Sequence, residues 1–110
     1  MKDCIFCRII KHEVPAEIVY EDQELIAFPD INPDAPIHIL IVPKQHIESL
    51  NELEASDTLL AGKILRLAGK IAKEKGIDKS GYRVRINTGP DAGQIIKHLH
   101  VHLVGGKKLS

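Results

Sequence analysis

The 110-residue chain has no excess of either charge, no long apolar run and only two cysteines. Lys plus Arg and Asp plus Glu each number 15, so no global field attracts nucleic acid or an anionic membrane. The longest strongly apolar run, residues 39–42, is far shorter than the roughly 20 residues that cross a bilayer. The first residues also lack an apolar signal region. We therefore expect a cytoplasmic protein that binds neither nucleic acid nor membranes.

The chain also lacks repeats, low-complexity tracts and linkers, and its length suits a single domain over residues 1–110. It has no G-x-G-x-x-G turn and no repeating βαβ pattern, which disfavours a Rossmann-type dinucleotide fold. The hydrophobic periodicity predicts helices over residues 4–11 and from Ser56 as N-cap to about Gly76, and strands over residues 18–21, 25–29, 37–42, 82–86 and 98–104. The short connections between these elements favour an antiparallel or mixed sheet with helices packed on it, an α+β domain.

The two cysteines lie only three positions apart, at Cys4 and Cys7. In a cytosolic protein this spacing suggests metal or redox chemistry rather than a structural disulfide. A structural zinc site needs two further ligands, and His46 and His98 are available after the buried strand and at the start of the last strand. A Cys₂His₂ zinc site would fasten the N-terminus to the sheet. The alternative, two buried free thiols, stays open.

The most informative segment is the row of histidines His98, His100 and His102, which alternate with aliphatic residues. This alternation has the period of a β-strand, so it places the three imidazoles on one face and the aliphatic side chains on the other. Three histidines in strict alternation, out of six in the chain, point to chemistry rather than to packing.

Three roles fit the row: a His₃ catalytic zinc site, a nucleophile with acid–base groups for group transfer, or passive phosphate binding. If zinc takes His98, then His100 and His102 remain for chemistry, with His38 as a natural fourth histidine. Neutral imidazole is a competent nucleophile towards phosphorus and titrates near neutrality. Backbone N–H groups of the loop over residues 89–94, where Gly93 permits close approach, would complete a phosphate site.

Several motifs together resemble the histidine triad family of nucleotide-binding proteins, in its compact, phosphoramidase-like branch. The resemblance rests on segments 4–7, 28–33, 38–44, 46–47 and 87–105, in that order. It covers almost the whole chain, and the alternating histidine motif is highly specific.

The resemblance implies a fold and an activity. The fold is a five-stranded antiparallel sheet with one long and one short helix, assembled as a homodimer. The activity is hydrolysis of purine nucleoside phosphoramidates and acyl-nucleotides at the α-phosphate, through a nucleotidyl-histidine intermediate. Because histidine chemistry at phosphorus needs no metal, we expect no catalytic metal.

The resemblance also assigns roles to single residues. His100 matches the nucleophile, and His102 matches the residue that hydrogen-bonds the phosphate. The supporting positions are His38, His98 and Asn87. The nucleotide contacts that it implies are Asp30 on the ribose, Phe28 and Ile31 at the base, and Asn87, His100 and His102 at the phosphate. Gly93 and Gln94, of the loop described above, complete the expected phosphate contacts. Some microbial members bind structural zinc through residues that match Cys4, Cys7, His46 and His98.

One departure concerns Ile95, which stands where the best-known hydrolases have a serine that contacts the phosphate or leaving group. Leaving-group preference is therefore open. Two other functions remain as alternatives: a dinucleoside polyphosphate hydrolase of the same family, and a non-enzymatic nucleotide-binding regulatory module.

Overall fold

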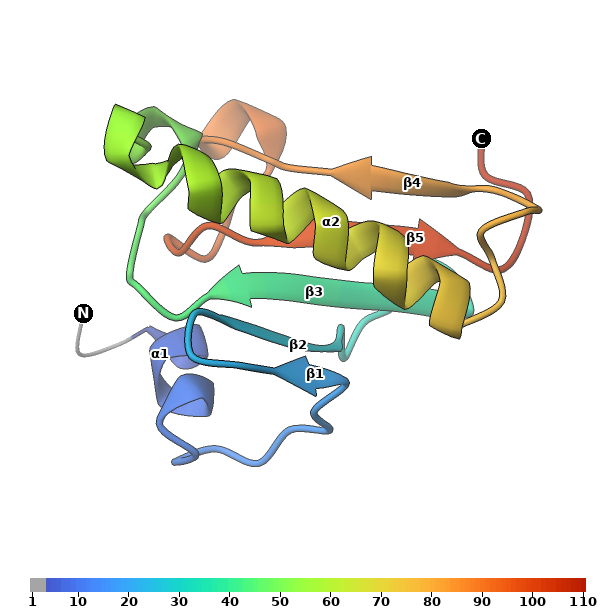
Figure 1. Cartoon of the computed structure of the whole chain (residues 1–110), viewed down its shortest axis with the longest axis horizontal. Helices are drawn as coiled ribbons and strands as arrows, with labels where there is room; N and C mark the ends of the chain where they lie inside the picture. The colour runs from blue at the N-terminus through green and yellow to red at the C-terminus, as the bar shows by residue number, and fades with distance from the viewer. Residues whose placement is uncertain (1–3) are drawn as a thin grey trace.

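The computed structural model describes residues 4–110 as one antiparallel sheet with a helix on each face (Figure 1). The strands are β1 (Tyr20–Glu21), β2 (Leu25–Pro29), β3 (Ile37–Pro43), β4 (Tyr82–Arg85) and β5 (Val101–Gly105), in the spatial order β1-β2-β3-β5-β4. The helices are α1 (Ile5–Ile10) and α2 (Thr58–Glu74), and short 3₁₀ turns cover Leu50–Glu52, Ala55–Asp57 and Pro90–Ala92. The predicted α+β fold with five antiparallel strands, one long helix and one short helix is confirmed. No helix among residues 4–110 is long and apolar enough to cross a membrane.

Helix α2 crosses one face of the sheet and buries its apolar side there (Figure 1). Leu60, Ile64 and Ile71 recur at helical spacing and pack on the sheet, as the periodicity predicted. Helix α2 ends before Gly76, whose φ of 74° is the left-handed conformation of a residue just after a helix. The predicted start at Ser56 is wrong: Ser56 lies in a 3₁₀ turn, and Asp57 is the N-cap. The reason is a capping box between Glu54 and Asp57, which closes that turn first.

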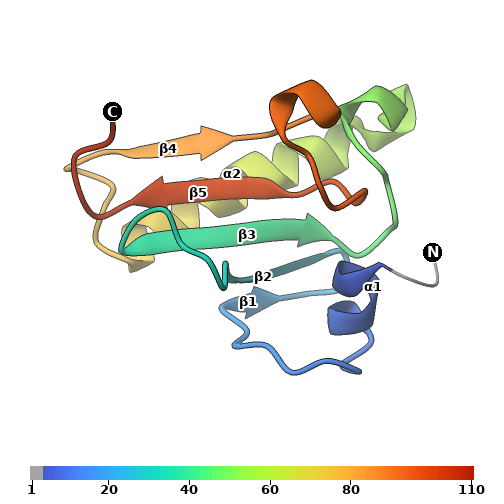
Figure 2. The same ribbon diagram turned by 180° about the vertical axis from the view of Figure 1, so that it is seen from behind.

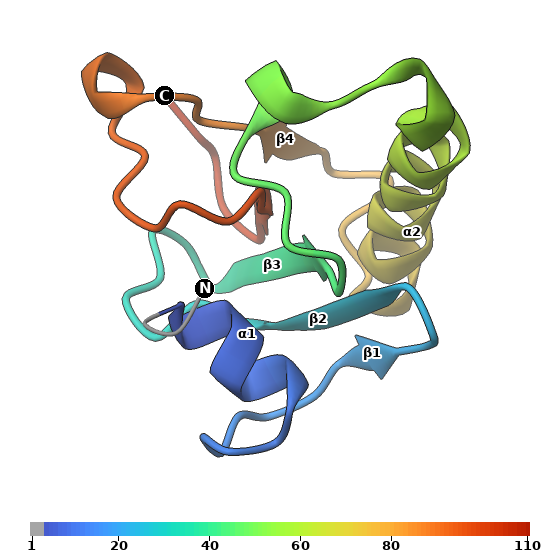
Figure 3. The same cartoon turned by 90° about the vertical axis from the view of Figure 1, so that its left-hand side faces the viewer.

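The opposite face carries the second, smaller core, beneath α1 (Figures 2 and 3). Phe6 and Ile9 of α1 pack against strands β2 and β3 there. Strand β3 is therefore buried on both faces, as its continuous aliphatic sequence predicted. The first predicted strand, residues 18–21, is shortened to Tyr20–Glu21.

The histidine row is only partly a strand. Strand β5 begins at Val101, so His102 lies within it while His98 and His100 lie in the segment that leads into it. The ladder with β3 stops because the backbone N–H of Leu99 donates instead to the carbonyl of Ile47, at 2.6 Å. The predicted alternation nevertheless holds. Leu99, Val101 and Leu103 belong to the core beneath α2, while the histidines face the other way.

Candidate functional site

The three histidines of the row face three different partners. The ring of His98 lies against Cys4 and Cys7. The ring of His100 lines a cavity beside α1, and the ring of His102 meets His38 of β3. Among residues 4–110, their ligand atoms do not converge as a His₃ zinc site requires, and His100 belongs to no cluster of converging ligand atoms. The geometry therefore does not support the His₃ zinc alternative.

The hydrogen bond of His100 determines its tautomer. Its Nδ1 lies 2.7 Å from the backbone carbonyl oxygen of His98. A carbonyl can only accept, so Nδ1 carries the proton and the lone pair of the neutral ring is on Nε2. The ring is 9% exposed and packs edge-on against Phe6, with centroids 5.1 Å apart. In its neutral form, His100 therefore has a fixed orientation with an unprotonated Nε2.

His38 and His102 form a directed pair. The backbone N–H of Asp34 donates to Nδ1 of His38 at 3.0 Å, so the proton of a neutral His38 is on Nε2. That Nε2 lies 2.9 Å from Nδ1 of His102, which must then accept. The proton of His102 is consequently on Nε2, which is buried and has no hydrogen-bond partner among residues 4–110. A buried donor without a partner is suited to donate a hydrogen bond to an oxygen atom of a bound ligand.

Burial is also the largest influence on the pKa of His102, which it lowers to about 4, followed by the charge of Arg85. His102 is therefore a neutral donor at neutral pH. Burial likewise lowers the pKa of His98. These two directions favour the uncharged forms of His98 and His102.

A cavity of about 510 Å³ opens beside His100. Its walls include Phe6, Phe28 and Leu40, and the rim carries Asp30 and Ile31. Its size is in the range of small-molecule sites, which are mostly apolar with a few polar groups. Of the predicted nucleotide contacts, the structure brings together Phe28, Asp30, Ile31 and His100.

The remaining predicted phosphate contacts lie elsewhere. The described walls of this cavity do not include Asn87, Gly93, Gln94 or His102. The amide of Gln94 is engaged internally: its Oε1 accepts from Gly89 N–H at 2.9 Å, and its Nε2 donates to the carbonyl of Glu48 at 2.7 Å. Gln94 therefore shapes the loop before the histidines. The phosphate role of Asn87, Gly93, Gln94 and His102 stays a prediction.

A second hollow of about 580 Å³ lies over α2 and has a different character. Its walls include Lys63, Arg66, Lys70 and Lys73, and it contains no histidine. These residues are the solvated side of α2.

The predicted zinc ligands Cys4, Cys7, His46 and His98 come together in one cluster. Their four ligand atoms lie within 4.8 Å of one another. Nδ1 of His98 is 3.3 Å from Cys4 Sγ and 3.6 Å from Cys7 Sγ, while Nδ1 of His46 is 3.2 Å from Cys7 Sγ. A tetrahedral ion with bonds of about 2.3 Å to sulfur and 2.0–2.1 Å to nitrogen separates its ligand atoms by roughly 3.3–3.8 Å.

The surroundings of the cluster also suit a metal. Nε2 of His98 donates to the carbonyl of Pro43 at 2.8 Å, which leaves Nδ1 unprotonated and aimed at the cysteines. This is the outer-shell partner that metal-bound histidines usually have. Burial, followed by the neighbouring Cys4, raises the pKa of the Cys7 thiol. Metal binding must therefore release a proton from this site. The donor set and its spacing fit zinc.

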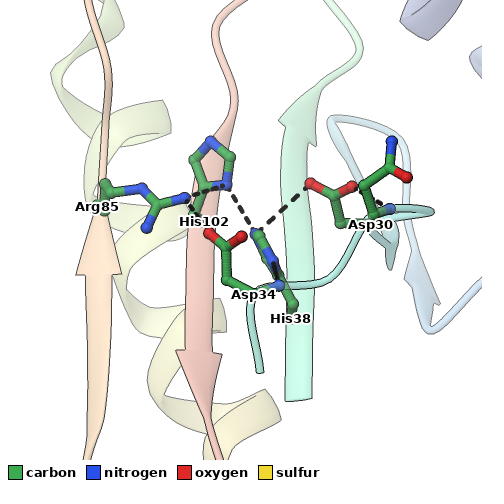
Figure 4. Close-up of polar contacts among 6 residues, drawn as sticks. Asp30, Asp34, His38, Arg85 and His102 are labelled. Atoms are coloured by element: carbon green, nitrogen blue, oxygen red, sulfur yellow. Dashed lines mark hydrogen bonds and ion pairs between the residues drawn. The ribbon is translucent and has the colours of Figure 1, made fainter. Parts of the chain in front are cut away.

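Sequence reasoning missed Arg85 and Asp34, which lie beside the His38–His102 pair (Figure 4). In the sequence Arg85 alternates with apolar residues of a strand and resembles any solvated position. Asp34 lies in a proline-rich loop with no recognisable motif. Only the strand order, which places β4 next to β5, shows that the two residues meet.

Known proteins resemble this chain over nearly its whole length. The family model described as "Scavenger mRNA decapping enzyme C-term binding" matches residues 3–110. An uncharacterized HIT-like protein of Buchnera aphidicola is 52% identical over 106 residues, covering 96% of this chain and 95% of its own. The purine nucleoside phosphoramidase of Escherichia coli K12 is 43% identical over 108 residues, covering 98% and 91%.

A solved structure agrees with the sequence relatives. The histidine triad protein of Clostridium difficile superposes with a TM-score of 0.96 at 49% identity, covering all of this chain and 96% of its own. Because the relatives, the fold and the alternating histidines all agree, the chain belongs to the histidine triad family.

Proposed function

We propose that this protein is a nucleotide hydrolase that cleaves purine nucleoside phosphoramidates and acyl-nucleotides at the α-phosphate through a nucleotidyl-histidine at His100. One observation carries the proposal: the Nδ1–H of His100 donates to the His98 carbonyl at 2.7 Å, so the lone pair is on Nε2 of a ring that lines the cavity. The relative in Escherichia coli that is named a purine nucleoside phosphoramidase supports the choice of substrate class.

The reaction takes place in two displacements. Nε2 of His100 attacks the α-phosphorus, a P–N bond to the ring forms, and the bond to the departing amine breaks as that amine takes up a proton from water. Water then attacks the same phosphorus and loses a proton to the hydroxide left by the first step, the bond to His100 breaks, and the nucleoside monophosphate leaves. His100 is restored, so covalent catalysis divides one difficult step into two.

The neighbouring residues bind and orient the nucleotide. The free Nε2–H of His102 donates to a phosphate oxygen, and His38 fixes the tautomer that provides this donor. Asp30 accepts hydrogen bonds from the ribose hydroxyls, while Phe28 and Ile31 enclose the base. Asn87, Gly93 and Gln94 are expected to assist at the phosphate.

Zinc is the structural ion that we propose for Cys4, Cys7, His46 and His98, on the strength of their donor set and spacing. When bound, it would link α1 to the segment that leads into β5. The chemistry at phosphorus is carried by histidine alone, so no step requires a metal.

A homodimer is the assembly that we propose. Strand β4 is an edge strand of the sheet, and such an edge is a template for pairing with another chain. Tyr82 and Val84 of β4 and Leu65 of α2 are exposed apolar residues, which suits a partner surface. The cytoplasm is the proposed compartment, because the unpaired Cys4 and Cys7 belong to a reducing environment.

The test is hydrolysis of an adenosine 5′-phosphoramidate that releases a fluorogenic amine. We expect turnover by the wild type and a loss on the order of 10⁴-fold or more in His100→Ala. His12→Asn is the matched control, because His12 is an exposed histidine outside the site. Alkaline quenching of the wild type, which preserves a P–N bond to histidine, should trap a nucleotidyl adduct on His100.

Two results would change the proposal. Nucleotide binding without turnover of any adenylate would support the non-enzymatic binding module. Faster cleavage of a dinucleoside polyphosphate than of the phosphoramidate would favour the other hydrolase class of the family.

A further inference from the structure

Arg85 connects the edge strand to the centre of the proposed site. Its Nη2 lies 3.1 Å from Oδ2 of Asp34 and 3.5 Å from Nδ1 of His102 (Figure 4). Asp34 belongs to the loop between β2 and β3, so one guanidinium reaches across β5 from β4 to that loop. The same loop begins with Asp30, which lies at the rim of the cavity.

Asp34 contacts the other end of the histidine pair. Its backbone N–H donates to Nδ1 of His38 at 3.0 Å, and Nε2 of His38 lies 2.9 Å from Nδ1 of His102. The four residues therefore form a closed ring of contacts: Arg85 to Asp34, Asp34 to His38, His38 to His102, and His102 to Arg85. Two donors, from His38 and Arg85, aim at the single lone pair on Nδ1 of His102.

We infer that Arg85 is a positioning residue of this enzyme: together with Asp34 it holds His38 and His102 in the arrangement that presents the Nε2–H of His102 to the phosphate. This inference rests on the proposed function, since it names a further residue of the same site. Arg85 acts through His102 and Asp34 and need not touch the substrate.

The charges around His102 support this role. Four groups face it besides the buried core: His38 from β3, Arg85 from β4, His100 from the preceding segment and Asp30 from the loop. After burial, the charge of Arg85 contributes most to the low pKa of His102, and only Asp30 opposes it. The Arg85 guanidinium also holds the pKa of the Asp34 carboxyl below its usual range. Arg85 therefore adds to burial in favouring the neutral form of His102, and it favours the charged form of Asp34.

Stability alone does not explain an arginine at this position. The side chains of Arg85 and Asp34 are 33% and 58% exposed, and exposed ion pairs contribute little to folding. The Nε–H of Arg85 is in addition buried without an acceptor among residues 4–110, which is unfavourable. The contribution of Arg85 should therefore appear in the state of His102 rather than in the melting temperature.

The experiment compares Arg85→Met, Arg85→Lys and Arg83→Met with the wild type. Arg83 is the matched control because it lies two positions earlier on the same face of β4, yet donates to the carbonyl of Ser110. Two readouts are recorded for each protein: the imidazole NMR titration and tautomer of His102, and the pH dependence of kcat/KM.

In Arg85→Met we expect the His102 titration and the acidic limb of kcat/KM to move upward together by about one pH unit. Arg85→Lys keeps the charge and should restore both readouts, while Arg83→Met should match the wild type. Asp34→Asn keeps the backbone N–H but releases the loop that carries Asp30, so it should raise KM more than it lowers kcat.

Different results would contradict the role of Arg85 and the proposed function. If the wild type turns over substrate while Arg85→Met leaves the His102 titration, its tautomer and the pH profile unchanged, the inference about Arg85 is wrong. If the wild type has no turnover, the proposed function fails. The NMR titration then still decides whether Arg85 sets the state of His102.

Discussion

The backbone carbonyl of His98 accepts the Nδ1 proton of His100 at 2.7 Å, while the ring of the same His98 presents Nδ1 to Cys4 and Cys7. One residue thus belongs to two sites, through its backbone in one and its side chain in the other. Nε2 of His98 is fixed by the Pro43 carbonyl at 2.8 Å, and the ring is fully buried. The position of the proposed nucleophile therefore depends on how firmly His98 is held.

Removal of the proposed metal should affect the fold before the chemistry. We expect the purified protein to hold equimolar zinc, and Cys4→Ser with Cys7→Ser to lose it. Because structural zinc contributes directly to folding, the melting temperature should fall by about 10–20 °C. Elemental analysis and calorimetry measure the two quantities.

His46→Ala separates the two sites. His46 is a proposed ligand whose contacts lie with Cys7 and the His98 ring. We expect this variant to lose zinc and stability, yet to keep near wild-type turnover well below its melting temperature, since the Pro43 bond still orients His98. Loss of turnover in the folded variant would instead show that the metal is needed to position His100.

Asp30→Asn tests the ribose contact. Hydrogen bonds to a charged group contribute about 1.5–3 kcal/mol, so KM should rise roughly 10–100-fold while kcat changes little. A 2′,3′-dideoxy substrate should raise the wild-type KM by a similar factor and leave the variant almost unaffected. Equal discrimination by both proteins would exclude Asp30 from ribose binding.

The stability of the protein should fall in mild acid because of His102. In the unfolded chain this histidine has a pKa of about 6.5, whereas in the folded protein its pKa is about 4. Below pH 6.5 His102 becomes protonated in the unfolded state while it stays neutral in the folded state. The free energy of unfolding is therefore at its full value above about pH 6.5, declines as the pH falls towards 4, and loses about 3 kcal/mol in total from this group.

Urea denaturation of the wild type and His102→Gln measures this effect. Other acid-sensitive groups are common to both proteins, so the stability difference between them should change across pH 6.5–4 in favour of the variant. A difference that is independent of pH would contradict the low pKa.

Substitution by alanine at two glycines should change the free energy of unfolding in opposite directions. A Cβ on Gly105 would lie 2.8 Å from Cδ1 of the buried Ile77 and 3.3 Å from Cβ of Tyr82, so Gly105→Ala should destabilise by about 1–3 kcal/mol. Gly62 lies on the exposed side of α2 with open space around its Cβ position. Gly62→Ala should stabilise by about 0.5–1 kcal/mol. Urea denaturation of both variants provides the comparison.

The sequence predicted the elements whose pattern is local. The helical spacing of Leu60, Ile64 and Ile71 and the continuous aliphatic run of β3 each indicate one structure, and both are present. The four residues predicted for a Cys₂His₂ site also lie close together. The boundaries were harder, because Ser56 and Asp57 are both good caps and the choice depends on Glu54.

Contacts between distant segments could not be predicted. Arg85 and Asp34 are 51 positions apart and meet only because β4 and β5 are neighbours. The backbone contact between Leu99 and Ile47, which ends the ladder at Val101, is likewise set by tertiary packing. No period or motif encodes such pairs.

The alternation along residues 98–104 also separates two classes of substitution, which should have different effects in a cell. Substitutions at Leu99, Val101 or Leu103 remove packing beneath α2 and should reduce the amount of protein in a cell. Substitutions at His100 or His102 should leave abundance nearly intact while abolishing turnover. A saturation library scored once for abundance and once for activity would therefore show two maps with a period of two residues, each displaced from the other by one position.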